Sequence, residues 1–282
     1  MMTRILFILL IFFFVQNESF AQNTHQLNIL SWNVFLRPAF LQDDQMERVD
    51  SIANYLLNSQ ADVLVLQEVF HKKAKRKLIK QLKSQYHFAS VTGKKSFWGV
   101  PSGVLILSKH QIITEKHVNF KAATGSDKMA CKGGISTIID FFGYKIQIIG
   151  THLQAGKGDK RNRIRRKQLR TLKTIEDSTT TASIYVGDFN ITMESEHYAQ
   201  MMKSLECENI NPLGEKQSTA NFSDNELYPT SGKSKWIDFI LLRKSRKAKL
   251  LKSTIEEPKS RIKNRLSRLS DHNPIISTIV VN

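Results

Sequence analysis

Cysteine is scarce in this sequence of 282 residues, which contains Cys131 and Cys207 and no further thiol. Two cysteines cannot build a disulfide framework or a cysteine-based zinc site, because both need more thiols. One disulfide and two free thiols both stay open, since sequence does not show whether the two Cα atoms come within bonding distance. With 6 Pro and 13 Gly the chain is also no collagen and no low-complexity polymer, so we expect a globular protein.

Acidic residues are the second shortage. The chain has 25 Asp and Glu against 42 Lys and Arg, which gives a formal net charge of +17. Such an excess predicts attraction to polyanions such as nucleic acid, or to an anionic membrane surface. The basic residues concentrate in three runs, residues 72–83, 157–173 and 243–268. The main interpretation of these runs is that they form solvated faces of the protein. The functional alternative is that they dock to an anionic surface.

A long apolar run is also missing. The run at residues 5–15 is shorter than the about 20 residues that a membrane-spanning helix needs. Because Arg4 precedes it and a polar stretch ending at Ala21 follows it, residues 1–21 are typical of a secretory signal peptide, with an uncleaved anchor as the alternative. No Pro/Gly/Ser-rich linker divides residues 22–282, so we expect one soluble, secreted domain, in the periplasm or the medium.

Short β-rich runs alternate with polar or amphipathic stretches from residue 27 onward. Apolar residues between Val49 and Leu57 recur at the spacing of a helix, and residues 72–83 predict a second, basic helix. Most expected strands carry Ile, Val or Leu on both faces and therefore need cover on both sides. We expect an α/β fold of two packed sheets flanked by helices. The expected strands are residues 27–34, 61–69, 103–107, 134–140, 145–150, 184–186, 236–242 and 275–281.

Polar side chains follow or interrupt several of these strands, where a rigid scaffold meets a loop. Asn33 and Glu68 lie near the ends of two of them. Amide and carboxylate oxygens suit a hard cation such as Mg²⁺. Taken singly, each residue has a plainer interpretation, because a strand-terminal Asn usually forms a turn and a strand-terminal Glu usually faces water.

Two further strands end in chemistry-bearing residues. His152 either donates to a phosphoryl oxygen or packs as a neutral core residue. Asp188 and Asn190 are two positions apart, on one side of an extended backbone, so they either hold a metal-bound water and a phosphate oxygen or form an Asx turn. Asp238 interrupts an apolar run, where an unpaired carboxylate would be costly to bury. His272 offers a partner, and a histidine oriented by a carboxylate is a general base.

Taken together and in this order, these motifs resemble the endonuclease/exonuclease/phosphatase superfamily. The resemblance runs from Leu27 to the C-terminus. It implies a four-layer α/β sandwich of the DNase-I-like type and divalent-metal-dependent hydrolysis of a phosphate ester, with the site at one end of the sheets. The motifs are Asn33, Gln67-Glu68, Gly150-Thr151-His152, Gly187-Asp188-Phe189-Asn190, Asp238 and Ser270-Asp271-His272.

One loop narrows the resemblance to neutral sphingomyelinases. Residues 125–134 are similar to the Asp-Lys loop and the Lys-Gly pair of that family, which places Asp127, Lys128 and Lys132 at the substrate. The segments 32–38 and 151–155 are also similar to it. The resemblance implies hydrolysis of sphingomyelin, or a related choline phospholipid, to ceramide and phosphocholine at a membrane surface. We expect a monomer.

Hydrolysis of a phosphodiester needs positive charge at the phosphate, because the anion repels an attacking hydroxide. We therefore expect Glu68 to be the principal Mg²⁺ ligand with Asn33 assisting, and Mn²⁺ or Co²⁺ to be alternative ions. The cation would neutralise a phosphoryl oxygen and the leaving alkoxide. Asp271 is assigned to a second metal position, and the sequence leaves open whether one or two metals bind.

The remaining polar residues are assigned to proton transfer and positioning. His272 is predicted to be the general base, and Asp238 to hold its tautomer. Asp188 and Asn190 would position the attacking water and the phosphate. His152 would stabilise the five-coordinate phosphorus.

Membrane docking is predicted to differ from that of secreted bacterial sphingomyelinases. Those enzymes typically carry a hairpin with exposed aromatic residues near the final Asp-His, whereas residues 243–268 here are basic and contain no Trp or Phe. Phe97 and Trp98 are the candidates for insertion at the lipid interface, with packing inside their own loop as the alternative.

Two alternatives to a sphingomyelinase follow from the charge. An exported nonspecific nuclease of the same fold would use the basic surface for phosphate neutralisation. A noncatalytic cationic membrane-binding module would use it for docking, but such a module has no need to retain Glu68, Asp188, Asn190 and His272 together. Comparing the hydrolysis of sphingomyelin with that of plasmid DNA by one purified sample separates the sphingomyelinase from the nuclease.

Overall fold

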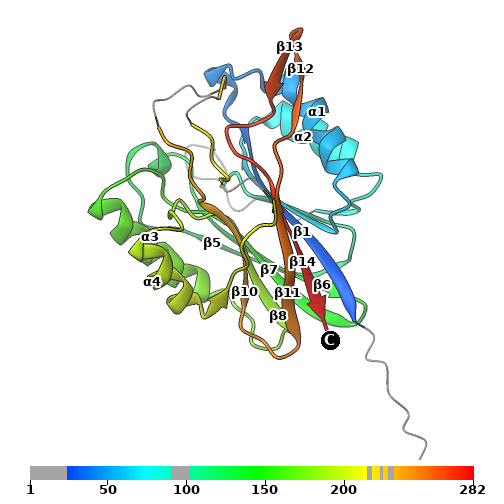
Figure 1. Cartoon of the computed structure of the whole chain (residues 1–282), viewed down its shortest axis with the longest axis vertical. Helices are drawn as coiled ribbons and strands as arrows, with labels where there is room; N and C mark the ends of the chain where they lie inside the picture. The colour runs from blue at the N-terminus through cyan, green and yellow to red at the C-terminus, as the bar shows by residue number, and fades with distance from the viewer. Residues whose placement is uncertain (1–23, 90–101, 215–217, 223–224, 228–231) are drawn as a thin grey trace, which may run out of the picture.

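Two six-stranded β-sheets pack face to face at the centre of the protein (Figure 1). This computed structural model describes residues 24–89, 102–214, 218–222, 225–227 and 232–282. The predicted signal peptide, residues 1–21, and the Phe97-Trp98 pair lie outside the described residues, so both stay predictions.

The first sheet has the strand order β11-β14-β1-β2-β4-β3, and the second has the order β5-β6-β7-β8-β10-β9. Each sheet contains one central parallel pair, β1 with β2 and β7 with β8. The strands are β1 (His25–Leu36), β2 (Val63–Val69), β3 (Phe88–Ala89), β4 (Leu105–Ser108), β5 (Ile112–Asn119), β6 (Gly133–Phe141), β7 (Tyr144–His152), β8 (Ala182–Asp188), β9 (Cys207–Glu208), β10 (Asp238–Arg243), β11 (Ala248–Ile255), β12 (Lys259–Ile262), β13 (Arg265–Arg268) and β14 (Ile275–Val281).

Two α-helices cover the outer face of each sheet. Leu56 of α1 and Leu78 of α2 pack on the first sheet, while Leu172 of α3 and Leu205 of α4 pack on the second. The resulting order of layers, helix, sheet, sheet, helix, confirms the expected four-layer α/β sandwich. The helices are α1 (Gln45–Asn58), α2 (Lys72–Leu82), α3 (Asp159–Lys173) and α4 (Glu196–Leu205), with short 3₁₀ helices η1 (Ala39–Leu41) and η2 (Gly125–Lys128).

Alternating side chains of β1 supply two hydrophobic cores. Ile29 lies in the core between the two sheets, where it joins Ile148 of β7. Leu30 points the other way, into the core beneath α1 and α2. Because side chains alternate across a strand and both faces of β1 are covered, apolar residues occupy both sets of positions. Each fully buried side chain of this size contributes about 1.5–3 kcal/mol.

The basic run at residues 72–83 contains α2, as predicted, whereas the elements inside the other two basic runs were not predicted. Residues 157–173 contain α3, whose buried face holds Arg165 and Gln168 beside Leu169 and Leu172. Because polar residues occupy half of that face, the apolar period of the helix is hidden in the sequence. Residues 243–268 contain β11 and the β12–β13 hairpin, in which Lys and Arg occupy many of the outward positions.

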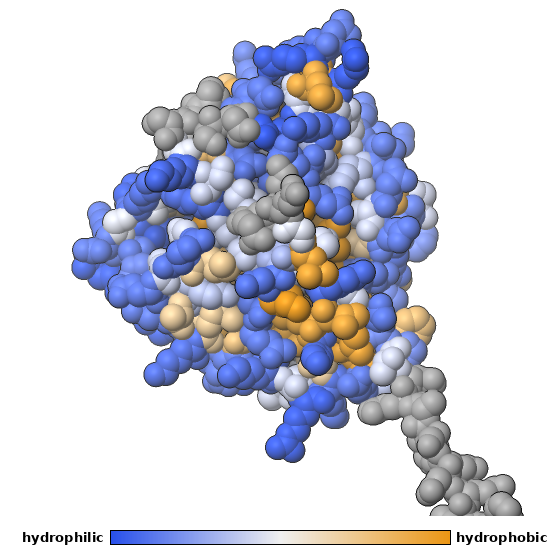
Figure 2. All heavy atoms as spheres, viewed as in Figure 1, coloured by the Kyte–Doolittle hydropathy of each residue, from blue (hydrophilic) through white to orange (hydrophobic). Residues whose placement is uncertain are grey.

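The β12–β13 hairpin projects from the end of the molecule opposite the C-terminus (Figure 1). Its exposed apolar side chain is Leu266, which is 62% exposed, and it has no aromatic residue. Lys263 Nζ lies 2.5 Å from Asp44 Oδ1, which links the hairpin to the start of α1. Hydrophilic side chains predominate on the projecting end in Figure 2, as the net charge of +17 leads one to expect.

Both cysteines are free thiols, Cys131 half-buried after η2 and Cys207 buried in β9. The open choice between one disulfide and two thiols is therefore decided in favour of thiols. Among the described residues, no helix is long and apolar enough to cross a membrane.

Candidate active site

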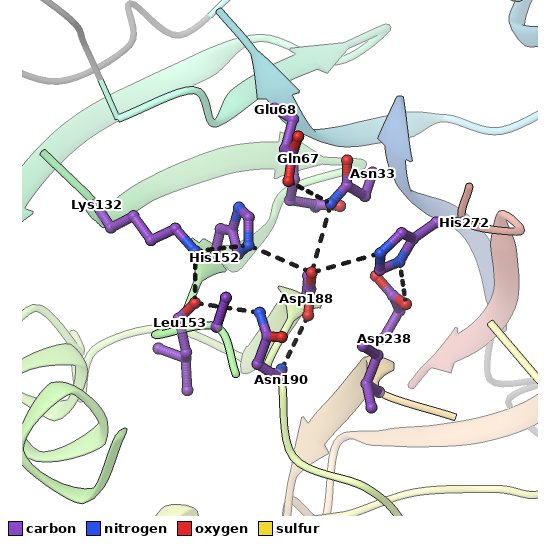
Figure 3. A network of polar contacts seen from close by, with 12 residues as sticks. Asn33, Gln67, Glu68, Lys132, His152, Leu153, Asp188, Asn190, Asp238 and His272 are labelled. Carbon is purple, nitrogen blue, oxygen red and sulfur yellow. Dashed lines mark hydrogen bonds and ion pairs between the residues drawn. The ribbon is translucent and has the colours of Figure 1, made fainter. Parts of the chain in front are cut away.

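The ends of the central strands meet at one edge of the two sheets and bring the predicted polar residues together (Figure 3). Parallel pairing sets Asn33 of β1 opposite Gln67 of β2, next to Glu68. In the second sheet, His152 of β7 is opposite Asp188 of β8. Antiparallel pairing then sets Asp238, the first residue of β10, opposite Asp188 as well.

Asn33 joins the two sheets across this edge. Its amide Nδ2 donates to Glu68 Oε1 at 3.3 Å and to Asp188 Oδ2 at 3.4 Å. Asn33 is buried, and its Oδ1 accepts a hydrogen bond from the backbone N–H of Phe35. Glu68, which is half-buried, therefore lies one amide group away from Asp188.

Two site residues have left-handed backbone conformations. Glu68 has a φ of 56° and Asn190 a φ of 51°. This conformation is uncommon for residues other than glycine and concentrates at functional sites. At Asn190 it is supported by the backbone N–H, which donates to Asp188 Oδ1 at 2.9 Å, and by Nδ2, which donates to the Leu153 carbonyl at 3.2 Å.

His272 and Asp238 form a buried pair. The distance from His272 Nδ1 to Asp238 Oδ2 is 2.8 Å. Because Asp238 accepts at Nδ1, the second ring nitrogen, Nε2, is left to face Asp188, whose Oδ2 lies 3.9 Å away. Burial works against charging this ring, but Asp238 and Asp271 outweigh it and hold the pKa of His272 well above its usual value.

The loop that carries His272 is fixed onto β1. Trp32 Nε1 donates to the His272 carbonyl at 2.9 Å. Ser270 Oγ donates to the Asn33 carbonyl at 2.5 Å and accepts from the His272 N–H at 3.1 Å. These three contacts fix the backbone of the loop, and with it the imidazole of His272, relative to β1.

Arg48 of α1 supports the same loop and was missed in the sequence. Its guanidinium is fully buried, and Nη1 donates to the carbonyls of Val34 and Leu269 at 3.0 and 2.6 Å. Burial lowers the pKa of Arg48 to about 10. The available signal was its spacing, because Arg48 lies four positions before Ile52 and therefore on the buried stripe of the helix.

Lys132 lies beside His152 on the opposite side of Asp188 from His272 (Figure 3). Its Nζ is 2.8 Å from His152 Nε2, and it donates to the Leu153 carbonyl at 2.9 Å. Burial, followed by the charge of Lys132, holds the pKa of His152 well below its usual value. A neutral ring that accepts from Lys132 at Nε2 carries its proton on Nδ1, so Lys132 supplies the positive charge on this side of the site.

The residues expected at the substrate separate into two groups. Asp127 is buried and contacts Lys132, with 3.0 Å between Oδ1 and Nζ, while its Oδ2 accepts from the Ala155 N–H at 2.6 Å. Asp127 thus holds Lys132 and the loop after β7 in place. Lys128, one residue further in η2, is exposed and is not among the described residues that line the active cavity.

Two carboxylates of the site, Asp188 and Asp271, have raised pKa values. Burial, reinforced by Asp238, raises the pKa of Asp188 to about 7. Burial also raises the pKa of Asp271 to about 6, an effect that His272 opposes and Glu68 reinforces. Acidic groups gathered in this way are stabilised by a cation placed between them.

The donor set fits a hard divalent cation. Glu68 and Asp271 offer carboxylate oxygens, which Mg²⁺ prefers. Asn33 would offer its amide oxygen after its amide group turns, because Nδ2 faces Glu68 in this structure. Asp188, Asp238 and His272 also have ligand atoms within 4.8 Å of one another. In that second group, His272 Nδ1 and Asp238 Oδ2 already contact each other. Because these two atoms are not free to bind a metal, the pair is better suited to proton transfer.

One cavity of about 1230 Å³ lies at this edge of the sheets. Glu68, Asp188, Asp271 and His272 line it. The predicted metal ligand, Glu68, and the predicted general base, His272, therefore face the same space. Its lining also includes Phe40 of η1, which is 78% exposed, and other residues of the rim.

Comparison with known proteins identifies relatives over most of the chain. Sphingomyelinase C of Bacillus cereus is 27% identical over an alignment of 305 positions, gaps included, which covers 94% of this chain and 90% of that protein. Phospholipase C of Staphylococcus aureus is 28% identical over 251 residues, covering 78% of this chain and 74% of that protein. A mutant beta toxin of Staphylococcus aureus, solved with bound magnesium ions, has a TM-score of 0.77 at 24% identity and covers 90% of this chain and 99% of its own.

The match to a family is equally broad. Residues 30–272 match the family described as Endonuclease/Exonuclease/phosphatase. This range includes every strand-end residue of the site, from Asn33 in β1 to His272 before β14. The chain belongs to the Endonuclease/Exonuclease/phosphatase family.

Proposed function

We propose that this protein is a secreted, metal-dependent phosphodiesterase that hydrolyses sphingomyelin to ceramide and phosphocholine. The observation that carries the proposal is the buried His272–Asp238 pair, which faces Asp188 in the cavity that Glu68 also lines. The printed names of the relatives, sphingomyelinase C and phospholipase C, support a lipid phosphodiester as the substrate.

His272 would act as the general base. With Asp238 accepting from Nδ1–H, Nε2 would take a proton from water as the water oxygen forms a bond to phosphorus. A cation held by Glu68 and Asp271 would offset the carboxylate charge that raises the pKa of His272, and would so leave Nε2 unprotonated. Asp238 would then stabilise the imidazolium. Asp188 and Asn190, held by their mutual hydrogen bond, would position the water and the phosphate.

Positive charge would reach the phosphate from two sides. Glu68, Asn33 and Asp271 would hold the divalent cation, which when bound neutralises a phosphoryl oxygen and the leaving alkoxide of ceramide. Lys132 would stabilise charge on the far side of the phosphate, with Asp127 holding its ammonium group and His152 accepting from it.

Access to a membrane substrate is supported by the rim of the cavity. Phe40 and Leu41 of η1 are 78% and 41% exposed, and Met129 after η2 is 64% exposed. All three line the cavity. Exposed apolar side chains at the mouth of a site favour contact with lipid acyl chains. Docking through this rim would not require the aromatic hairpin that the chain lacks.

Export and oligomeric state complete the proposal. The sequence of residues 1–21 supports secretion to the periplasm or the medium, with residues 22–282 as one catalytic domain. We propose that the domain acts as a monomer.

A direct assay tests substrate and cofactor together. Purified protein is incubated with sphingomyelin, lysophosphatidylcholine and plasmid DNA, each with Mg²⁺ and with chelator, and phosphocholine release and DNA nicking are measured. We expect Mg²⁺-dependent phosphocholine release from sphingomyelin that His272→Ala abolishes. DNA nicking without phosphocholine release would replace the proposal with the nuclease alternative.

A further inference from the structure

Three cations that act on one another through space line the active cavity, beside the groups assigned to hydrolysis. Lys157 lies in the loop between β7 and α3, Arg165 lies on α3, and Lys235 lies just before β10. All three line the same cavity as Glu68 and His272. We call Lys157, Arg165 and Lys235 the cationic lobe.

The cationic lobe is rigidly built. Arg165 is 5% exposed, and its Nη1 donates to the carbonyls of Gln154 and Gly156 at 2.7 and 2.9 Å, which fixes the loop that carries Lys157. Lys235 exchanges two backbone hydrogen bonds of 2.9 Å with Ala220. Two of the three cations are therefore anchored through buried or backbone contacts.

No carboxylate forms an ion pair with the cationic lobe among the described residues, and Asp159 in the first turn of α3 is exposed. Among the described residues, the ammonium groups of Lys157 and Lys235 and the guanidinium of Arg165 form no ion pair, whereas the cation at the centre of the site, Lys132, has Asp127 at 3.0 Å. Asp188 and Asp127 act on Arg165 only through space. Burial, followed by the charges of Lys157 and Arg165, lowers the pKa of Lys235. Like charges assembled without a counterion favour an anionic ligand.

The backbone adds to the same potential. The helix α3 has 15 residues and begins at this lobe, and Gly156, Lys157 and Gly158 line the cavity. Gly158 is the N-cap and has no side chain with which to accept from the first turn. The positive end of the helix dipole therefore points to the place where the three cations meet.

We propose that Lys157, Arg165 and Lys235 form a second anion-binding subsite, which takes an anionic group carried by the head group of the phosphodiester substrate. The ligand class is a phosphate, sulfate or carboxylate located beyond the scissile phosphate. This inference rests on the proposed function in that the scissile phosphate lies at His272 and Glu68. A trimethylammonium group would be repelled by the lobe, so a choline head group must leave it empty, and acidic sphingolipid diesters become substrates in addition to sphingomyelin.

A lipid fits the cavity better than a nucleic acid does. The rim residues Phe40, Leu41 and Met129 are exposed and apolar, and they lie on η1 and directly after η2 rather than on α3. One cavity thus combines an apolar rim with a cationic lobe, which is the polarity of a lipid that has acyl chains at one end and an acidic head group at the other.

Binding of inorganic sulfate tests the subsite without catalysis. Calorimetric titration is done on protein held in chelator at low ionic strength, so that no metal contributes to anion binding. We expect Lys157→Ala/Lys235→Ala to raise the Kd for sulfate about tenfold or more. The matched control is Lys167→Ala/Lys233→Ala, in which each removed charge is exposed and outside the cavity lining. Equal affinity of the two double variants would overturn the subsite.

Kinetics on soluble substrates distinguishes a head group from a free anion. Two nitrophenyl phosphodiesters are compared, one carrying choline and one carrying a terminal phosphate monoester. We expect Lys157→Ala/Lys235→Ala to lower kcat/KM for the acidic diester about tenfold or more and to leave the choline diester unchanged or faster. The control double variant should match the wild-type protein on both.

The remaining outcomes each decide the inference. Weaker sulfate binding with no change on the acidic diester would overturn the head-group assignment, because the lobe would then take a free anion. A loss confined to plasmid DNA nicking would overturn it in favour of a nucleic acid phosphate. If wild-type protein hydrolyses neither diester, the proposed function fails, while the sulfate titration still decides whether the subsite exists.

Discussion

The two sides of the active cavity differ in how their charges are paired. At the centre, His272 lies 2.8 Å from Asp238 and Lys132 lies 3.0 Å from Asp127. In the cationic lobe, Lys157 and Lys235 form no ion pair with any described residue. Paired charges are held in one geometry, which catalysis requires. Unpaired like charges repel one another, and this repulsion destabilises the unliganded protein until an anion binds. The difference separates groups that act on every substrate from groups that choose among substrates.

The largest effect is expected at the centre. His272→Ala should lower kcat about 10²–10⁴-fold on sphingomyelin and on soluble diesters alike, because it removes the general base. Turnover of both substrates and the thermal unfolding midpoint are measured, and the midpoint should fall but stay above the assay temperature, because Asp238 is left buried without its partner. A variant that keeps the wild-type rate would show that the base is another group.

A second central substitution separates catalysis from folding. Lys132→Met should lower kcat about 10²–10³-fold, and it should destabilise the fold by about 3–5 kcal/mol because Asp127 is left buried without its partner. In Lys132→Met/Asp127→Asn, urea unfolding should show most of the stability regained while turnover stays low. Recovery of turnover in the double variant would contradict the role of Lys132 at the phosphate.

Metal activation should respond more weakly. Glu68→Gln should raise the Mg²⁺ concentration for half-maximal activity about 10–100-fold, since a neutral amide is a poorer ligand than a carboxylate. Rates are measured across a Mg²⁺ titration with a soluble diester. The control is Glu47→Gln, an exposed glutamate of α1, and identical titration curves for the two variants would exclude Glu68 as the ligand.

The smallest effect is expected at the rim and should appear on membranes alone. Phe40→Ala/Met129→Ala should lower the rate on sphingomyelin liposomes about 3–10-fold, because apolar area that contacts acyl chains is lost. Hydrolysis of a soluble choline diester should not change. Phe142→Ala is the control, since Phe142 is 66% exposed in the turn between β6 and β7, far from the cavity lining. Equal liposome losses in both proteins would exclude the rim.

The strand-end residues were predictable because topology fixes where they meet. Asn33, Glu68, His152 and Asp188 each end a run of apolar residues, and parallel pairing places such ends at one edge of the sheets. The order of the layers followed from strands that are apolar on both faces. In these strands the apolar pattern of the sequence matches the buried position in the fold, so the sequence alone was sufficient to predict them.

The supporting residues were not predictable, because their partners are distant in sequence. Arg48 reaches the carbonyl of Leu269 across 221 positions, and its place on a buried helix face gives no hint of that partner. Lys235 and Lys157 enter one cavity only after β7, α3 and β10 have packed. The helix α3 was hidden because Arg165 and Gln168 interrupt its apolar stripe.

A single short segment connects the two sides of the cavity. Ala220 forms a β-bridge to Lys235 and another to His272. On either side of it, the Asn221 N–H donates to the Asp271 carbonyl at 2.9 Å, and the Asn273 N–H donates to the Thr219 carbonyl at 2.6 Å. The backbone at Lys235 and the loop of His272 are therefore held by the same three residues, 219–221. A change that broke these backbone hydrogen bonds would disturb both sides of the cavity, whereas a change of the Lys235 side chain alone leaves the bonds in place.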